Sequence, residues 1–301
     1  MSKFIKDGIT IGFRLQSLTL IHSAIYLLSF LLLFAAFFMT DLPRFTQAID
    51  IDAIMSNPGE SIEDLSRELA ELDTAPFWHF GLYSSLVLLI VCLLLTYAAA
   101  GTYGVALWWR TQESQKAPPL SIFFQYGNRL FNPFLNLLGT IGLFLLGVVV
   151  IDSLIMIGLG LLINLTIGKI SFPLFMTFWM LLWSANFILY LLVMIGFLLF
   201  TLYALSRRVD KADPPTSICY DAFQFIRGRL SSTAALFFVG VILSLAPAIT
   251  ASVFFLLIDS AISHWSVNVL EALVHSYIAG FVTVYWLVAP YFHYLDEKIL
   301  E

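Results

Sequence analysis

One carboxylate stands inside a long apolar run, where an ionised side chain is costly enough to be a functional candidate. Asp152 lies within the apolar residues 134–165. Asn186, in the next apolar run, is a candidate hydrogen-bonding partner or a polar contact between helices. The two residue types indicate either a transport or proton-relay role or a structural one, and we favour the structural role.

A second set of polar residues falls near the outer ends of the apolar runs. It comprises His79, Asp259, His264, Glu271 and His275. Glu271 and His275 are four residues apart, so they share a helical face. Such residues can bind a metal, but the set lacks a metalloprotease signature such as H-E-x-x-H. We therefore favour ordinary polar roles, keep these five residues as weak candidates for a metal, and expect no cofactor.

A basic patch forms a third candidate, for the headgroups of anionic lipids. Its members are Arg207, Arg208, Lys211, Arg227 and Arg229. Nucleic-acid binding is not expected, since the excess of basic residues on the inner side of a membrane already accounts for these charges. The sequence contains no G-x-S-x-G nucleophile elbow and no Walker A motif. We expect no catalytic residues.

The composition places these residues in a membrane protein. Of the 301 residues, 60% are hydrophobic and 12% are charged, whereas soluble domains carry about 25% charged residues. A membrane-spanning helix needs about 20 apolar residues. Six runs reach that length, at about residues 15–39, 77–109, 134–165, 172–205, 232–258 and 269–295. We predict an all-α bundle that forms one integral membrane domain over residues 1–301.

Basic residues predict the orientation of this bundle. In a six-span arrangement twelve of the 15 Lys and Arg residues fall on one side, and Arg44, Arg67 and Lys169 fall on the other. The richer side is expected to face the cytoplasm, together with both termini. Residues 41–76 carry nine acidic residues and are expected to form an extracytoplasmic loop. The protein should lie in a cell membrane, and we favour a prokaryotic cytoplasmic membrane.

Two cytoplasmic loops, residues 110–131 and 206–230, resemble each other. Pro-Pro at 118–119 precedes Leu-Ser-Ile-Phe-Phe, and Pro-Pro at 214–215 precedes Thr-Ser-Ile-Cys-Tyr, with Arg-Leu following at 129–130 and 229–230. Because proline favours the first turn of a helix, each loop predicts an interfacial helix. The alternative is chance convergence of two proline-led loops.

Two further stretches predict local packing. Residues 4–14 mix bulky apolar residues with flanking basic ones, as in a segment that lies in the cytoplasmic interface. Two glycines leave a loosely ordered tail as the alternative. Ala100 and Gly104 form a small-xxx-small pair that can let another helix approach closely.

Several of these motifs together resemble a broad group of prokaryotic six-helix proteins, similar to the membrane domain of some glycerophosphodiester phosphodiesterases. They are the lead-in with Asp7-Gly8, Gly101-Thr102-Tyr103-Gly104, the segments 121–124 and 127–129, and the closing residues 291–298. The resemblance covers most of the chain and implies a six-helix membrane fold. It implies no phosphodiesterase activity, because no soluble phosphodiesterase domain is present.

Three functions remain open. The one we favour is a non-enzymatic membrane protein that organises partners or lipids. The second is a transporter of small molecules or lipids, and the third is a metal-dependent enzyme at the outer face. Membrane lipids are the expected partners, and membrane-protein partners and self-association are left open.

Overall fold

The computed structural model describes residues 3–40, 75–111, 120–166, 172–261 and 265–300. Within these ranges the chain forms eight α-helices and no strand. Six of these helices are long and apolar enough to cross a membrane. They are α2 (Gln16–Met39), α6 (Ala75–Thr111), α7 (Leu120–Thr166), α8 (Phe172–Asp210), α10 (Leu230–Ala261) and α11 (Trp265–Leu300).

The predicted all-α bundle of six apolar helices is confirmed, and the chain is a multi-pass membrane protein. Large apolar side chains remain exposed along the spans, Leu154 on α7 and Phe187 on α8 among them. Such surfaces suit contact with lipid tails. Most of the predicted acidic loop, residues 41–74, lies outside the described residues.

The lead-in is helical, so the alternative of a loose tail is wrong. Helix α1 runs over Lys3–Arg14 and is separated from α2 by Leu15. Its apolar residues Ile5 and Ile11 are buried. A Cβ placed on Gly8 would lie 2.8 Å from Cβ of Ala289 on α11, so this glycine lets two helices approach closely.

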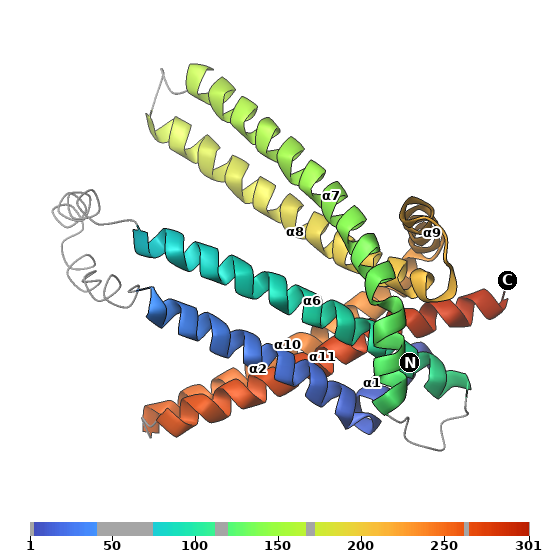
Figure 1. Ribbon diagram of the computed structural model, residues 1–301. Helices are drawn as coiled ribbons and strands as arrows, with labels where there is room; N and C mark the ends of the chain where they lie inside the picture. Colours follow the sequence, from blue (N-terminus) through green and yellow to red (C-terminus); the bar gives the residue numbers. More distant parts are fainter. Residues whose placement is uncertain (1–2, 41–74, 112–119, 167–171, 262–264, 301) are drawn as a thin grey trace. The chain divides into compact units, whose positions relative to one another are not determined.

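The two proline-led loops differ in the structure. The second contains a separate helix, α9 (Pro215–Gly228), with proline in its first turn as predicted. The first forms no separate interfacial helix, because residues from Leu120 onward belong to the continuous α7. Figure 1 shows the first turns of α7 at an angle to the rest, and Pro133 lies inside this helix, where proline removes a backbone hydrogen bond.

The described chain divides into two compact units. Unit 1 comprises Met1–Leu18, Thr96–Pro247 and Val282–Glu301, and unit 2 comprises Thr19–Leu95 and Ala248–Phe281. The expectation of a single domain over residues 1–301 stays a prediction.

Glycines and aromatic rings interlock inside unit 1. A Cβ on Gly101 of α6 would meet the ring of Phe123 on α7, and a Cβ on Gly127 of α7 would meet the ring of Tyr97 on α6. Gly104 likewise lies against Tyr126. The predicted close approach at Gly104 is therefore present, and its neighbour is α7.

Unit 2 has its own close approach. Gly280 of α11 lies against Ser23 and the backbone of Thr19 on α2, with no space for a Cβ. The ring centroids of Phe37 and Phe80 are 6.2 Å apart, which joins α2 to α6.

Candidate functional site

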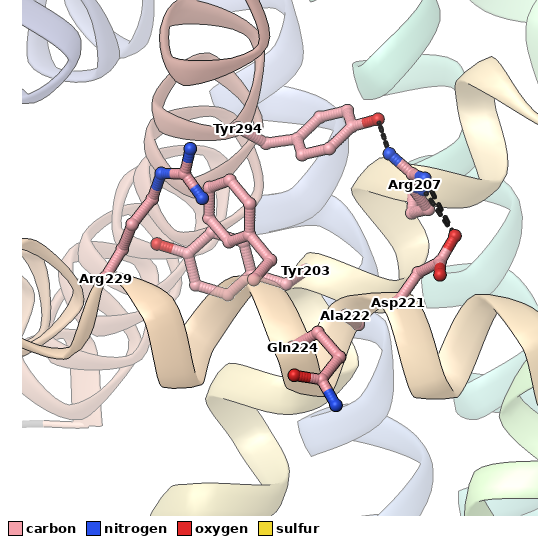
Figure 2. Close-up of a pocket in the computed structure, with 8 residues that line it drawn as sticks. Tyr203, Arg207, Asp221, Ala222, Gln224, Arg229 and Tyr294 are labelled. Atoms are coloured by element: carbon pink, nitrogen blue, oxygen red, sulfur yellow. Dashed lines mark hydrogen bonds and ion pairs between the residues drawn. The ribbon is translucent and has the colours of Figure 1, made fainter. Parts of the chain in front are cut away.

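A pocket of about 270 Å³ lies in unit 1, between α8, α9 and α11. Figure 2 shows the two cationic side chains of its lining, Arg207 and Arg229, on opposite sides of Tyr203. The lining residues are Tyr203, Arg207, Asp221, Ala222, Gln224, Phe225, Arg229 and Tyr294. The lining is thus mainly polar, aromatic and basic.

Helix α9 is positioned over this pocket by its apolar face. Ile218, Cys219 and Ala222 are buried, and α9 packs against α8 and α7. Since these residues fix the rotation of the helix, Asp221 is turned toward Arg207. The helix ends at Gly228, and the next residue, Arg229, has a non-helical backbone with φ −131° and ψ 39°.

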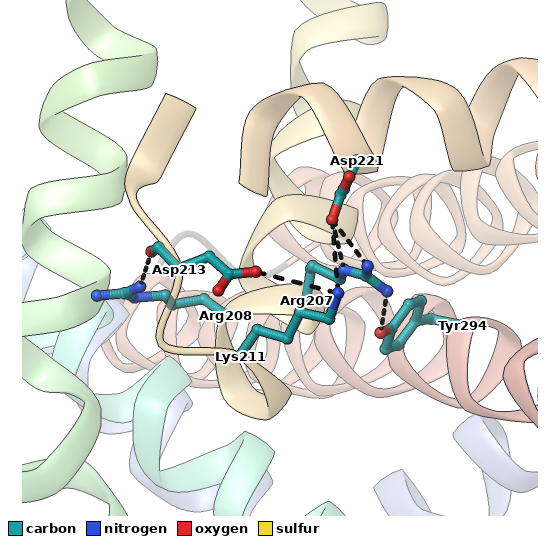
Figure 3. A network of polar contacts seen from close by, with 6 residues as sticks. All are labelled: Arg207, Arg208, Lys211, Asp213, Asp221 and Tyr294. Carbon is teal, nitrogen blue, oxygen red and sulfur yellow. Dashed lines mark hydrogen bonds and ion pairs between the residues drawn. The ribbon is translucent and has the colours of Figure 1, made fainter. Parts of the chain in front are cut away.

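Arg207 is held from two helices. Its Nε and Nη2 atoms donate to Oδ2 of Asp221 on α9, at 3.2 and 2.7 Å, and its Nη1 donates to the Tyr294 hydroxyl on α11, at 2.7 Å. Figure 3 shows these contacts as one network. Three of the five N–H groups of Arg207 enter these bonds. The guanidinium is therefore oriented before any ligand binds.

The other wall of the pocket is aromatic. The Tyr203 hydroxyl lies 2.5 Å from Nδ1 of His293, and both residues are buried. The Phe225 ring packs against the Tyr203 ring in a tilted arrangement, with an interplanar angle of 39° and ring centroids 5.1 Å apart. The guanidinium carbon of Arg229 lies 4.7 Å from the centroid of the Phe225 ring, a cation–π geometry. This wall gives Arg229 a fixed platform beside the pocket.

The charges of the lining do not cancel. Arg207 and Arg229 each contribute one positive charge and Asp221 one negative charge, which leaves a net charge of +1. Guanidinium groups recognise phosphate and carboxylate through paired hydrogen bonds. The arrangement can therefore bind an anion.

The two cysteines are not joined in a disulfide. Cys92 is exposed and Cys219 is buried on α9, and both are free thiols. Burial raises the pKa of the Cys219 thiol above its usual range. A neutral, covered thiol is a poor nucleophile.

The predicted basic patch is only partly available to a ligand. Arg207 and Arg229 line the pocket, and Arg227 is exposed. Arg208 extends away from Arg207 and donates to the carbonyl of Asp213 at 2.5 Å (Figure 3). Nζ of Lys211 lies 4.0 Å from Oδ2 of Asp213 and 3.9 Å from Oδ2 of Asp221, so both carboxylates are near this cation.

The predicted intramembrane pair forms in the structure. The side-chain amide of Asn186 donates to Oδ2 of Asp152 at 3.2 Å, which links α8 to α7. Figure 1 shows these two helices side by side over much of their length. Neither residue lines the pocket, and their role stays a prediction.

The proposed metal ligands do not assemble within the described part of the chain. Among its residues, no group of three or more His, Cys, Asp or Glu side chains could hold a metal ion. His79 is exposed, His264 lies outside the described residues, and so does the side chain of Asp259.

Both ring nitrogens of His275 lie within hydrogen-bond distance of protein oxygen atoms. Its Nδ1 lies 3.0 Å from the backbone carbonyl of Glu271, and its Nε2 lies 3.1 Å from the hydroxyl of Ser252. Because a carbonyl only accepts, Nδ1 must donate to it. Both ring nitrogens therefore have partners other than the Glu271 carboxylate.

Sequence reasoning missed most of the lining. Tyr203, Asp221 and Tyr294 were not candidates, although Asp221 and Tyr294 hold Arg207 and Tyr203 forms part of the aromatic wall. One available signal was acidic residues on the basic side of the chain, since Asp221 pairs with Arg207 and Asp296 pairs with Arg110. Carboxylates at such positions indicate arginines that are held in place.

No protein-family model, no curated protein and no solved structure matches this chain. The resemblance to the membrane domain of glycerophosphodiester phosphodiesterases stays a prediction.

Proposed function

We propose that this chain is a non-enzymatic multi-pass membrane protein that organises lipids by binding an anionic headgroup in the pocket of α8, α9 and α11. The observation that carries the proposal is the pair Arg207 and Arg229 beside the Tyr203 and Tyr294 side chains. A pocket of about 270 Å³ is smaller than the roughly 300 to 1,000 Å³ typical of ligand sites. It suits a headgroup better than a whole lipid.

The exposed face of α9 supports a location at the membrane surface. Tyr220 is 64% exposed and Phe223 is 54% exposed, and Arg227 lies on the same side of the helix. Aromatic and basic side chains on one helical face are typical of segments that lie among lipid headgroups. This placement would bring the pocket next to its ligand.

The distribution of basic residues supports the orientation. Twelve of the 15 Lys and Arg residues, Arg207 and Arg229 included, fall on one side in the six-span arrangement. We infer that this side faces the cytoplasm of a prokaryotic cell, with both termini on it. A tag near Glu60 should then be accessible from outside intact cells and a tag after Glu301 should not. The reverse result would overturn the orientation.

Lipid retention tests the binding site. The purified chain is washed in mild detergent, titrated with phosphatidylglycerol and phosphatidylcholine, and analysed by native mass spectrometry. The double variant Arg207→Gln, Arg229→Gln should lose most of the preference for phosphatidylglycerol. The matched control is Arg14→Gln, Arg129→Gln, which removes two exposed arginines of unit 1 outside the pocket.

The control removes the same number of positive charges, and Arg129 occupies the position in the first loop that Arg229 occupies in the second. If both double variants lose the preference equally, surface charge alone attracts the lipid and the pocket proposal fails. It also fails if the wild-type chain shows no preference for phosphatidylglycerol over phosphatidylcholine.

Transport is the second candidate, and the Asp152–Asn186 hydrogen bond favours it. A carboxylate with one amide partner inside a span is a plausible site for a proton relay. If the chain moves a solute through this residue, reconstituted Asp152→Asn should lose uptake. Unchanged uptake would reject the relay.

A further inference from the structure

We propose that Asp221 makes this pocket selective for the singly charged phosphate diester of a phospholipid over the doubly charged phosphate monoester of phosphatidic acid. The inference rests on the proposed function, because it assumes that an anionic headgroup enters the pocket. It adds the charge class of the ligand and the residue that sets it.

The charge of the pocket lining matches a ligand with one negative charge. The lining has a net charge of +1, from Arg207, Arg229 and Asp221. Lys211 lies outside the lining, with its Nζ 3.9 Å from Oδ2 of Asp221. Its positive charge is offset by Asp213, whose Oδ2 lies 4.0 Å from the same Nζ. A ligand with one negative charge neutralises the lining, whereas a ligand with two leaves a negative charge beside a carboxylate.

Asp221 occupies one edge of the Arg207 guanidinium. Oδ2 of Asp221 accepts from both Nε and Nη2 of Arg207, at 3.2 and 2.7 Å. That edge of the guanidinium is one that a phosphate would use for paired hydrogen bonds. A ligand must therefore use other donors of Arg207 while the Asp221 carboxylate stays close, or must displace that carboxylate. Repulsion between the carboxylate and the ligand doubles when the ligand carries two charges instead of one. The cost of removing the ligand from water rises faster with its charge than its attraction to the two arginines does.

The experiment compares two lipids in one sample. The full chain in mild detergent is titrated at about pH 8, where a phosphate monoester is mostly doubly charged, with equal amounts of phosphatidylglycerol and phosphatidic acid. Native mass spectrometry gives the ratio of bound lipids. Wild-type protein should prefer phosphatidylglycerol, and Asp221→Asn should shift the ratio toward phosphatidic acid by about tenfold.

Two variants separate charge from folding. Asp221→Glu keeps the charge and should keep the wild-type preference. Asp7→Asn removes a carboxylate of α1 in the same unit that does not line the pocket, and should leave the ratio nearly unchanged. Folding of each variant is checked by protection of the Cys219 thiol, which is buried on the same helix. If Asp221→Asn does not fold, loss of the preference in a folded Asp221→Glu variant overturns the inference, and its retention supports it.

The outcomes distinguish this inference from the proposed function. If no anionic lipid binds better than phosphatidylcholine, the proposed function fails. If anionic lipids bind but the wild type does not discriminate, or folded Asp221→Asn keeps the wild-type ratio, only the charge rule fails. Glycerophosphoglycerol and glycerol phosphate, added to protein in phosphatidylcholine nanodiscs, test a soluble source. Preferential binding of the diester glycerophosphoglycerol supports selection of a singly charged phosphate from a free ligand. Preferential binding of the monoester glycerol phosphate overturns that selection.

Discussion

Replacing Gly8 by alanine should loosen the contact between α1 and α11. A Cβ at residue 8 would lie 2.8 Å from Cβ of Ala289, 3.3 Å from its Cα and 3.4 Å from Cδ2 of Tyr285. The side chain of Ala289 has no rotamer that moves its Cβ away, so the helices themselves must separate. Ile5 and Ile11, which are buried on α1, would lose part of their packing.

Two opposing terms set the size of the effect. Alanine is favoured over glycine in a helix by about 1 kcal/mol, whereas forcing a methyl group into a packed contact costs about 1 to 3 kcal/mol. The matched control is Gly139→Ala on α7, where nothing lies within 4 Å of the added Cβ. Because the propensity term is common to both variants, their difference isolates the packing cost. Gly8→Ala should be less stable than Gly139→Ala by about 1 to 3 kcal/mol.

The assay is unfolding of the purified chain by SDS in mild detergent, followed through exposure of the Cys219 thiol. Cys219 lies in the same unit as Gly8, Ala289 and Gly139, so it reports on the part that the substitutions change. Equal stability of the two variants would refute the close approach of α1 and α11.

Four further predictions concern single side chains. The Cys219 thiol, whose pKa burial raises, should react with maleimide about tenfold more slowly at pH 8 in the folded chain than in the unfolded chain; equal rates would contradict its burial. Because burial raises the pKa of the Cys219 thiol in the folded chain, the unfolded thiol loses its proton first. This residue should therefore lower the free energy of unfolding as the pH rises through the range in which an ordinary thiol titrates, and Cys219→Ala should remove that part of the pH dependence. Gly280→Val should lower the free energy of unfolding by about 2 kcal/mol or more, because its side chain would enter Ser23, and SDS titration would contradict this if stability were unchanged. Asn186→Leu should cost about 0.6 kcal/mol by removing the hydrogen bond to Asp152, and the same substitution should cost nothing in an Asp152→Leu background, where residue 152 has no acceptor; an equal cost in both backgrounds would contradict the contribution of this bond.

The spans were predictable from sequence because the bilayer imposes one strong requirement, a run of apolar residues long enough to cross it. The small residue Gly104 also predicted a close helix contact, which the structure places against Tyr126. Both features depend on residues that are near each other in the chain.

The different structures of the two proline-led loops could not be predicted from their shared sequence pattern. Both contain Pro-Pro, but the first continues into α7 while the second breaks at Arg229. Gly228 stands before that break, where the first loop has Asn128. Glycine weakens a helix, but Gly127 lies inside the unbroken α7, so glycine alone does not explain the break. The segment between Pro-Pro and Arg-Leu is also four residues longer in the second loop, since Pro119 and Arg129 are 10 positions apart and Pro215 and Arg229 are 14 apart.

The pocket was harder to predict because its parts come from distant segments. Arg207 and Tyr294 are 87 residues apart, and their contact depends on how α11 packs against α8. The basic patch predicted a place where anions gather. It did not predict that Asp221 would hold Arg207 on one side, or that Phe225 would support Arg229.

Photocrosslinking tests the headgroup site most directly. A phosphatidylglycerol analogue with a photoreactive headgroup is added to the chain in nanodiscs, and the adducts are mapped by mass spectrometry. We predict adducts concentrated on α8, α9 and α11 at Tyr203, Gln224 and Tyr294, and their loss in Arg207→Gln, Arg229→Gln. Adducts distributed over exposed arginines such as Arg14 and Arg129, with no change in the double variant, would contradict the headgroup pocket.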